Sequence, residues 1–186
     1  EAEIAQAIRK KWQQFGEVFE DGLGNLSITL GKGEPHIAFV AHMDEVGFVV
    51  RRIGEDGFIS LNRLGGIPER VLAGQKILLL GRKGPIKGVF TTWPHHLTPD
   101  SEKYKVRSIT ECWVDVGAKN QIKVFDLGIK VGDFGVYERS WHVEGDFIFA
   151  NALDNRGGLA SITQMLQQLA GQTSFRLSAI ASVQEE

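Results

Sequence analysis

Three groups of acidic and imidazole side chains in this sequence could together hold divalent metal ions. They are His42 with Asp44, the single Asp154, and the pair Glu185–Glu186. Imidazole nitrogen and carboxylate oxygen are joint ligands of divalent ions such as zinc, cobalt and manganese. Two ions about 3.5–4 Å apart also need a carboxylate that bridges them. These residue types therefore suggest a dinuclear metal hydrolase, provided that the three groups meet in the fold.

The segments around these groups are expected to bring them to one edge of a sheet. An apolar run that begins after His36 ends abruptly in His42, and an uninterrupted run of this kind predicts a strand buried on both faces. Asp154 stands just before an expected helix, and Glu185–Glu186 follow a second apolar strand expected at 175–183. Ligands in open α/β sheets gather beyond the carboxyl ends of the strands, which is where all three groups are expected to lie.

The three groups suit different chemical tasks. Asp154 is the best bridging candidate because a short side chain just before a helix is held tightly. Successive residues of a strand point to opposite sides, so Glu185 and Glu186 need not do the same job. One can bind a metal while the other, uncoordinated, acts as a general base. Each group taken singly is more often a set of ordinary solvated acids, and only their combination favours a metal site.

The order of the expected elements predicts an interrupted α/β domain. An apolar stripe predicts a helix over about 3–14, and it comprises Ile4, Ala5, Ile8, Trp12 and Phe15. Short strands with glycine turns between 48 and 138 indicate a small β-barrel or sandwich. A second stripe predicts a helix over 156–169, and it comprises Leu159, Ile162, Leu166 and Leu169. We therefore expect an α/β domain in two parts, 1–47 and 139–186, with a β-domain inserted at 48–138.

The overall composition argues against some classes of partner and favours one cellular compartment. The 186 residues carry a net charge of −2 with a pI near 6.3, so electrostatics give no case for nucleic acid or an anionic membrane as a partner. No apolar run approaches the roughly 18–20 residues of a membrane span. Cys112 is the only cysteine, which excludes an intrachain disulfide and favours a reducing cytoplasm. Both ends look cut, so we expect the sequence to be part of a longer protein.

Several motifs, in order along nearly the whole chain, resemble the glutamyl/tetrahedral aminopeptidase family of dinuclear metallopeptidases, some members of which carry the name endoglucanase. The motifs are His42–Phe48, Gly65-Gly66, Pro94–Leu97, Val114–Ala118, Val131–Asp133, Ala152–Arg156 and Val183–Glu186. The resemblance implies a zinc-aminopeptidase-like α/β/α catalytic domain interrupted by an inserted small β-barrel. That inserted domain mediates dimers in the family, and the dimers assemble into a tetrahedral dodecamer.

The resemblance also implies a role for each candidate residue. His42 would bind one metal with Asp44 orienting its ring, and Glu186 would share that metal. Asp154 would bridge the two ions, and Glu185 would be the general base. The family completes its second metal site with an aspartate and a histidine that lie further along the sequence than residue 186. Asn155 stands where many relatives have a second aspartate, and we expect metal binding to survive this change.

The implied activity is the removal of N-terminal residues from short peptides, with two divalent ions, zinc or cobalt, as cofactors. Peptides and further copies of the chain are the expected partners, without nucleic acid or membrane. Two alternatives remain open at this point. One is a non-catalytic assembly or metal-binding relative, and the other is a related dinuclear hydrolase acting on another amide. The intact Glu185 favours an enzyme, because a decayed site has no reason to keep its base.

Overall fold

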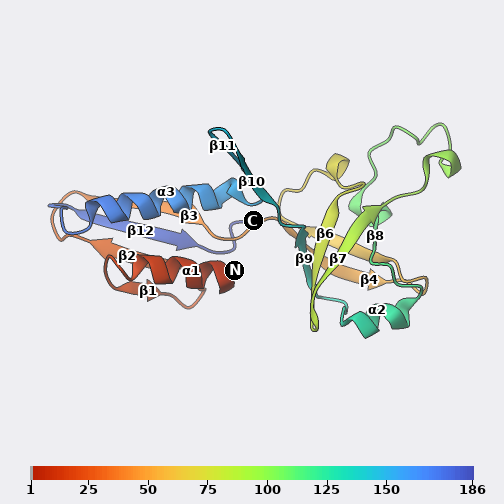
Figure 1. Cartoon of the computed structure of the whole chain (residues 1–186), viewed down its shortest axis with the longest axis horizontal. Coiled ribbons are helices and arrows are strands. Elements are labelled where there is room, and N and C mark those ends of the chain that lie inside the picture. The colour runs from red at the N-terminus through yellow and green to blue at the C-terminus, as the bar shows by residue number, and fades with distance from the viewer. Residues whose placement is uncertain (1) are drawn as a thin grey trace. The chain divides into compact units, whose positions relative to one another are not determined.

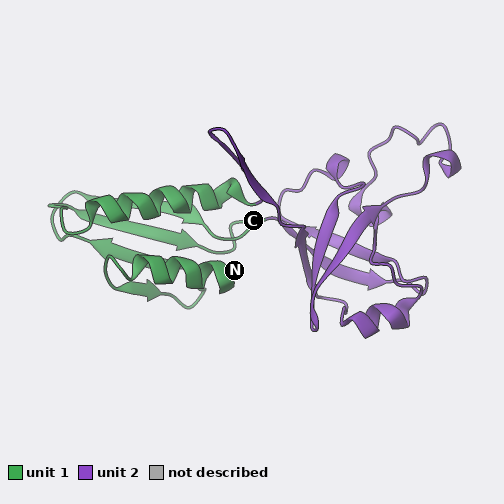
Figure 2. Ribbon diagram, viewed as in Figure 1, with its two compact units in different colours: residues 1–45, 152–186 green, residues 46–151 purple. Residues whose placement is uncertain are grey.

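A computed structural model describes residues 2–186, and the chain forms two compact units (Figure 2). The first combines the segment up to Glu45 with Ala152–Glu186, and the second is the continuous segment Val46–Asn151. Each unit has a hydrophobic core of its own. The chain is therefore a mixed α/β fold in which one unit is built from two separated segments.

The first unit contains a four-stranded sheet whose order is β1-β2-β12-β3 (Figure 1). The strands are β1 (Val18–Glu20), β2 (Leu26–Leu30), β12 (Arg176–Ser182) and β3 (His36–His42). β12 is antiparallel to β2 and parallel to β3. The last strand of the chain therefore lies between two of the first, so neither segment of this unit can form the sheet alone.

Two helices, α1 (Ala2–Trp12) and α3 (Leu153–Leu169), cover the same face of this sheet. The Nε1 of Trp12 donates a hydrogen bond to the Oγ1 of Thr163 at 2.9 Å, which ties the two helices to each other. Their buried residues share one core with alternate residues of the strands: Ile8, Trp12, Leu159, Ile162, Leu166, Leu26, Ile28, Leu177, Ala179 and Ala181. The two predicted helices and their apolar stripes are thus confirmed. The described residues supply two layers of the α/β/α arrangement, because both helices lie on one face.

Strand β3 differs from its prediction in burial. Its apolar run was expected to be buried on both faces, yet Phe39 is 42% exposed and Val40 is 59% exposed. Within residues 2–186, β3 pairs only with β12, so it is the edge of the sheet. The prediction of two-sided burial is wrong for this chain, because nothing among the described residues covers the second face or the free side of β3.

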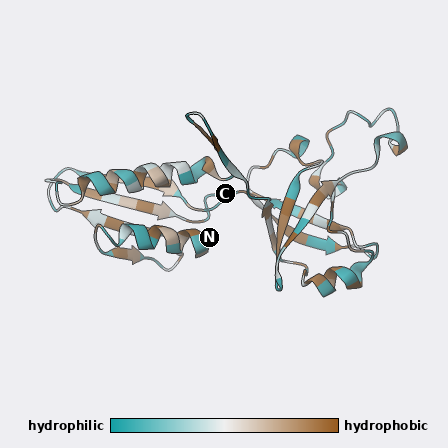
Figure 3. Ribbon diagram, viewed as in Figure 1, coloured by the Kyte–Doolittle hydropathy of each residue, from teal (hydrophilic) through white to brown (hydrophobic). Residues whose placement is uncertain are grey.

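The second unit is a closed six-stranded barrel of order β4-β5-β8-β7-β6-β9. Its strands are β4 (Gly47–Ile53), β5 (Ile59–Leu64), β6 (Lys76–Gly81), β7 (Gly84–Thr91), β8 (Trp113–Asp115) and β9 (Phe134–Tyr137). Hydrophobic and hydrophilic residues alternate along these strands (Figure 3), and the inward set includes fully buried Phe48, Ile77 and Phe90. Short strands and glycine turns predicted a small β-barrel or a sandwich, and the structure is a barrel.

Shorter elements lie between the barrel strands and after the last of them. Three 3-10 turns, at Glu69–Val71, His95–Leu97 and Ile109–Glu111, lie in the loops, and β10 (Trp141–Glu144) forms a hairpin with β11 (Phe147–Ala150). Helix α2 (Gln121–Leu127) was not predicted from the sequence, although both of its ends carry recognisable signals. The Oδ1 of Asn120 accepts a hydrogen bond from the backbone of Lys123, and Gly128 ends the helix at φ 94°. No helix in the described part of the chain has the length and apolarity needed to cross a membrane.

Candidate metal centre

The parallel pairing of β3 and β12 brings the first and last candidate groups to one edge of the sheet. In the register of this pair Ser182 lies beside His42, so the two strands end together. The backbone N–H of Met43 continues the pairing by donating to the carbonyl of Ser182 at 2.7 Å. His42 and the segment that leads to Glu185–Glu186 therefore leave the sheet side by side.

His42 is a buried imidazole that faces exposed carboxylates. Its Nε2 lies 3.2 Å from the Oδ1 of Asp154 and 3.7 Å from the Oε2 of Glu185. Ligand atoms of His42, Glu185 and Glu186 all lie within 4.8 Å of one another, and the described residues contain one such group. Asp154 meets His42 but does not belong to that mutual group. One nitrogen and several oxygens thus converge as they would around a borderline divalent ion.

Asp44 lies on the other side of the imidazole ring. The Nδ1 of His42 is 3.3 Å from the backbone carbonyl of Asp44 and 3.6 Å from its Oδ1. Oxygen acceptors therefore flank both ring nitrogens of His42. With an ion at Nε2, the acceptors of Asp44 would hold the ring proton on Nδ1. The donor set of one imidazole and several carboxylates fits the ions that the sequence suggested.

The buried carboxylate of Asp44 also reaches the end of the chain. Its Oδ2 accepts a hydrogen bond from the backbone N–H of Glu186 at 2.8 Å, while its Oδ1 is buried and has no hydrogen-bond partner among the described residues. Buried carboxylate oxygens normally have a partner. Asp44 therefore links the imidazole of His42 to the backbone of Glu186, and it places negative charge directly behind the ring.

Left-handed backbone precedes two of the carboxylate groups. Ala152 (φ 56°) and Gln184 (φ 60°) are the only non-glycine residues with positive φ among those described. Ala152 lies two residues before Asp154, and Gln184 immediately precedes Glu185. Such dihedral angles are uncommon for residues with a Cβ and collect at functional sites. Asp154 itself leaves helical angles (φ −85°, ψ 107°) inside α3, so its side chain projects from a kink.

A salt bridge fixes the loop after β3 to the start of α3. The Nη2 of Arg156 lies 2.9 Å from the Oε1 of Glu45, and its Nε donates to the backbone carbonyl of Met43 at 3.4 Å. Both residues belong to the same short motifs as His42 and Asp154. Neither residue was predicted to have a role, although their positions in the sequence beside His42, Asp44 and Asp154 were a signal. They hold two of the candidate groups in register.

Asn25 also positions the site, and the sequence did not predict this role. Its Oδ1 accepts from the backbone N–H of Val183 at 2.9 Å, and its Nδ2 donates to the Oδ2 of Asp21 at 2.7 Å. The turn before β2 therefore holds the segment that leaves β12, two residues before Glu185. An asparagine in a turn is common for local reasons, so its sequence alone carries no sign of this contact.

Comparisons with known proteins identify the family of this chain. The family model described as M42 glutamyl aminopeptidase matches residues 24–186. The Escherichia coli (strain K12) protein SgcX is 32% identical over 94% of this chain and 48% of its own length. The lysyl aminopeptidase of Pyrococcus furiosus is 31% identical over 91% of this chain and 49% of its own length.

A solved structure shows the same fold. The TET aminopeptidase from the marine sediment archaeon Thaumarchaeota archaeon SCGC AB-539-E09 superposes with a TM-score of 0.89 at 29% identity, over 97% of this chain and 53% of that one. The chain spans about half the length of the curated relatives that it matches. The resemblance inferred from the motifs is confirmed. With a family match over most of its residues, the chain belongs to the M42 glutamyl aminopeptidase family.

Proposed function

We propose that this chain carries part of the active site of a metal-dependent aminopeptidase that removes N-terminal residues from short peptides. The observation that carries the proposal is the convergence of His42, Glu185 and Glu186 at one edge of the sheet, with Asp154 against the same imidazole nitrogen. The names of relatives support the reaction class, since they include a lysyl and a glutamyl aminopeptidase.

Each residue of the centre receives a role in this proposal. His42 and Glu186 would hold one divalent ion, zinc or cobalt, and Asp154 would be shared with a second ion. Glu186 suits a fixed ligand because its backbone N–H is anchored to Asp44. Asp154 suits a shared ligand because its Oδ1 faces His42 while its side chain is 87% exposed. When bound, the ions supply Lewis acidity toward the scissile carbonyl and toward water.

The remaining steps belong to the side chains. The carboxylate of Glu185, 60% exposed, would take a proton from the attacking water and then deliver it to the leaving amine. Asp44 would keep the ring of His42 in its metal-binding tautomer throughout. The exposed carboxylates would also pair with the free α-ammonium group of the peptide, which accounts for a preference for N-terminal residues.

The proposal is tested by the substitution Glu185→Gln in the complete protein. We expect turnover of aminoacyl chromogenic substrates to fall by about 10²–10⁴-fold, because a general base is removed, while bound metal remains. The matched control is Glu17→Gln, which changes an exposed glutamate of the same unit away from the centre. A Glu185→Gln variant with the turnover of the parent would refute the assignment of Glu185 as the general base.

Two measurements separate this proposal from its alternatives. Substrates with a free α-amine should be cleaved and their N-acetylated counterparts should not, whereas an acylamide hydrolase would give the reverse result. A protein that binds metal but turns over neither substrate class would be the non-catalytic relative.

We further propose that the barrel unit is an inserted domain used for self-association into a homo-oligomer, by dimers that assemble into a dodecamer. Four large apolar side chains that are about half exposed or more support an interface on it: Ile122, Phe125, Val131 and Phe134. One similar structure, the TET1 peptidase of Pyrococcus horikoshii, is described as assembling into a tetrahedron or a large octahedral shell. Light scattering after size exclusion tests the proposal, and a Phe134→Glu variant should dissociate the oligomer.

A cytoplasmic location is proposed as well. Cys112 is a free and buried thiol, which a reducing compartment would preserve.

A further inference from the structure

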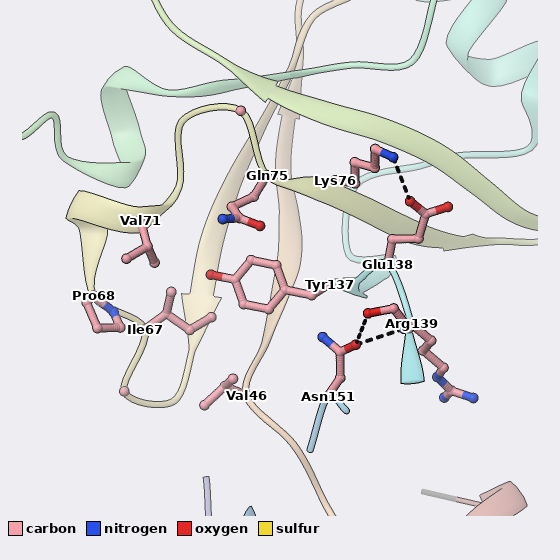
Figure 4. Close-up of a pocket in the computed structure, with 13 residues that line it drawn as sticks. Val46, Ile67, Pro68, Val71, Gln75, Lys76, Tyr137, Glu138, Arg139 and Asn151 are labelled. Atoms are coloured by element: carbon pink, nitrogen blue, oxygen red, sulfur yellow. Dashed lines mark hydrogen bonds and ion pairs between the residues drawn. The ribbon is translucent and has the colours of Figure 1, made fainter. Parts of the chain in front are cut away.

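The barrel unit contains a cavity of about 690 Å³ that the proposed metal chemistry does not use (Figure 4). One wall is apolar and is formed by the side chains of Val46, Ile67, Pro68 and Val71. Its volume lies within the usual range of ligand pockets, about 300–1,000 Å³. The apolar wall offers a surface against which an aliphatic or aromatic side chain could pack.

The hydroxyl of Tyr137 is the most informative group in this cavity. Its oxygen is buried and has no hydrogen-bond partner among the described residues, which is unfavourable for a polar group. The ring is held edge-on against buried Phe48, with centroids 5.3 Å apart. Burial raises the pKa of Tyr137, so the phenol stays protonated and able to donate. A ligand with an acceptor at this point would satisfy the hydroxyl.

Two side-chain amides face the same space. In Figure 4 the amide of Gln75 lies above the ring of Tyr137, and the backbone carbonyl of Gln75 is fixed by a 2.9 Å bond from the N–H of Phe90. Asn151 uses its Oδ1 to accept from Ser140, which leaves its amide nitrogen on the side of Tyr137. A phenol and two amides together offer the donors and acceptors that match a peptide group.

Two charged side chains at the rim, Glu138 and Lys76, already lie in ion pairs. Glu138 lies 3.8 Å from the Nζ of Lys76 and 2.5 Å from the Nζ of Lys87. Arg139, on the same side of the cavity, also has an interaction partner. A charged ligand would therefore have to compete with existing ion pairs, whereas a neutral ligand would not.

We propose that this cavity binds a neutral peptide segment, with one apolar side chain against Val46, Ile67 and Val71. The amide of that residue bonds to the hydroxyl of Tyr137 and the carboxamide of Gln75. This site lies entirely within Val46–Asn151 and uses none of the metal candidates. It would hold a peptide without cleaving it, so the proposal goes beyond the aminopeptidase reaction and does not depend on it.

The probe for this site is N-acetyl-leucinamide, a neutral residue blocked at both ends that an aminopeptidase needing a free amine cannot cleave. We expect saturable binding to the chain by ¹H–¹⁵N chemical-shift titration, with shifts at Gln75, Tyr137 and Asn151. The experiment is run in the presence of a chelator, so that failure of the metal proposal leaves the outcome unchanged.

Tyr137→Phe distinguishes a ligand contact from a structural one. We expect it to weaken binding of the probe about tenfold, the value of one hydrogen bond, and not to lower the urea midpoint of unfolding, because the hydroxyl has no partner to lose. Tyr104→Phe is the matched control: it changes the other tyrosine of the chain, which is 91% exposed and lies outside the cavity, and it should bind the probe as the parent does.

Three results would overturn the proposal. The first is no saturable binding of the blocked residue, and the second is parental binding by Tyr137→Phe. The third is binding of inorganic phosphate in place of the amide, which would mark the cavity as an anion site.

Discussion

Replacement of Asp44 by asparagine should weaken metal binding while sparing the fold. The Oδ2 of Asp44 accepts from the backbone N–H of Glu186 at 2.8 Å, and asparagine can keep that bond with its own oxygen. Its NH₂ group would then turn toward the Nδ1 of His42, where Oδ1 now lies at 3.6 Å. A donor at that point favours the tautomer with the proton on Nε2, which has no lone pair left for a metal.

The expected magnitude follows from the position of Asp44 behind the ligand. Loss of a group that orients a metal-binding histidine typically costs 10–100-fold in metal affinity, or about 1.4–2.7 kcal/mol. The metal-free fold should change little. The carboxylate is buried with one oxygen unpartnered, so its charge contributes little to stability and its removal should alter the free energy of unfolding by under about 1 kcal/mol.

Two measurements on the same variant check this reasoning. Cobalt titration followed by visible absorption gives the metal affinity, and urea unfolding in a chelator gives the stability. Asp100→Asn is the matched control, since it removes a 94% exposed carboxylate from a loop of the barrel unit. Cobalt affinity within twofold of the parent, or a loss of stability as large as the loss of binding energy, would refute the role of Asp44 as a positioning residue.

Two further predictions concern groups outside the centre. Cys112 is buried, and burial raises the pKa of its thiol. At pH 8 the thiol should therefore react with a thiol reagent at least about 100-fold more slowly in the folded chain than in urea. Equal rates in the two states would contradict its burial. A hydrogen bond from the side chain of Asn25 is the main cause that lowers the pKa of Asp21 below its usual value. The stability that Asp21 contributes is therefore present above its unfolded pKa and is lost as the pH falls through its folded pKa. Urea unfolding from pH 5 to pH 2.5 should show a smaller loss for Asp21→Asn than for the parent, and an unchanged slope would exclude this contribution.

The parts of the fold that follow from local periodicity were predictable. The stripes that end in Trp12 and Leu169 repeat every three or four residues, because one face of each helix packs on the sheet. Helix α2 was missed because seven residues are too few to display that period. Burial of β3 on both faces was predicted wrongly. An apolar run shows that a strand can be covered on both faces, but the described residues leave one side of β3 open.

The location of the candidate site was predictable, because the ends of two strands determine it. Because β3 and β12 are parallel neighbours, His42 and the segment before Glu185 had to leave the sheet at one edge. The turns that aim the carboxylates were not predictable. Ala152 and Gln184 adopt left-handed angles, yet neither residue type signals a turn, so only tertiary contacts can impose them.

The place of β12 between β2 and β3 has a consequence for the order of folding. Within the described residues, β3 pairs only with Arg176–Ser182. This partner follows the whole barrel in the sequence, so β3 cannot pair until the barrel segment has been synthesised. Contacts so far apart form slowly because a long loop must close first. The barrel strands pair within one continuous segment, so during synthesis Val46–Asn151 can fold while the earlier strand is still waiting for its neighbour. The metal candidates would then meet last, since both His42 and Glu185 depend on that late pairing.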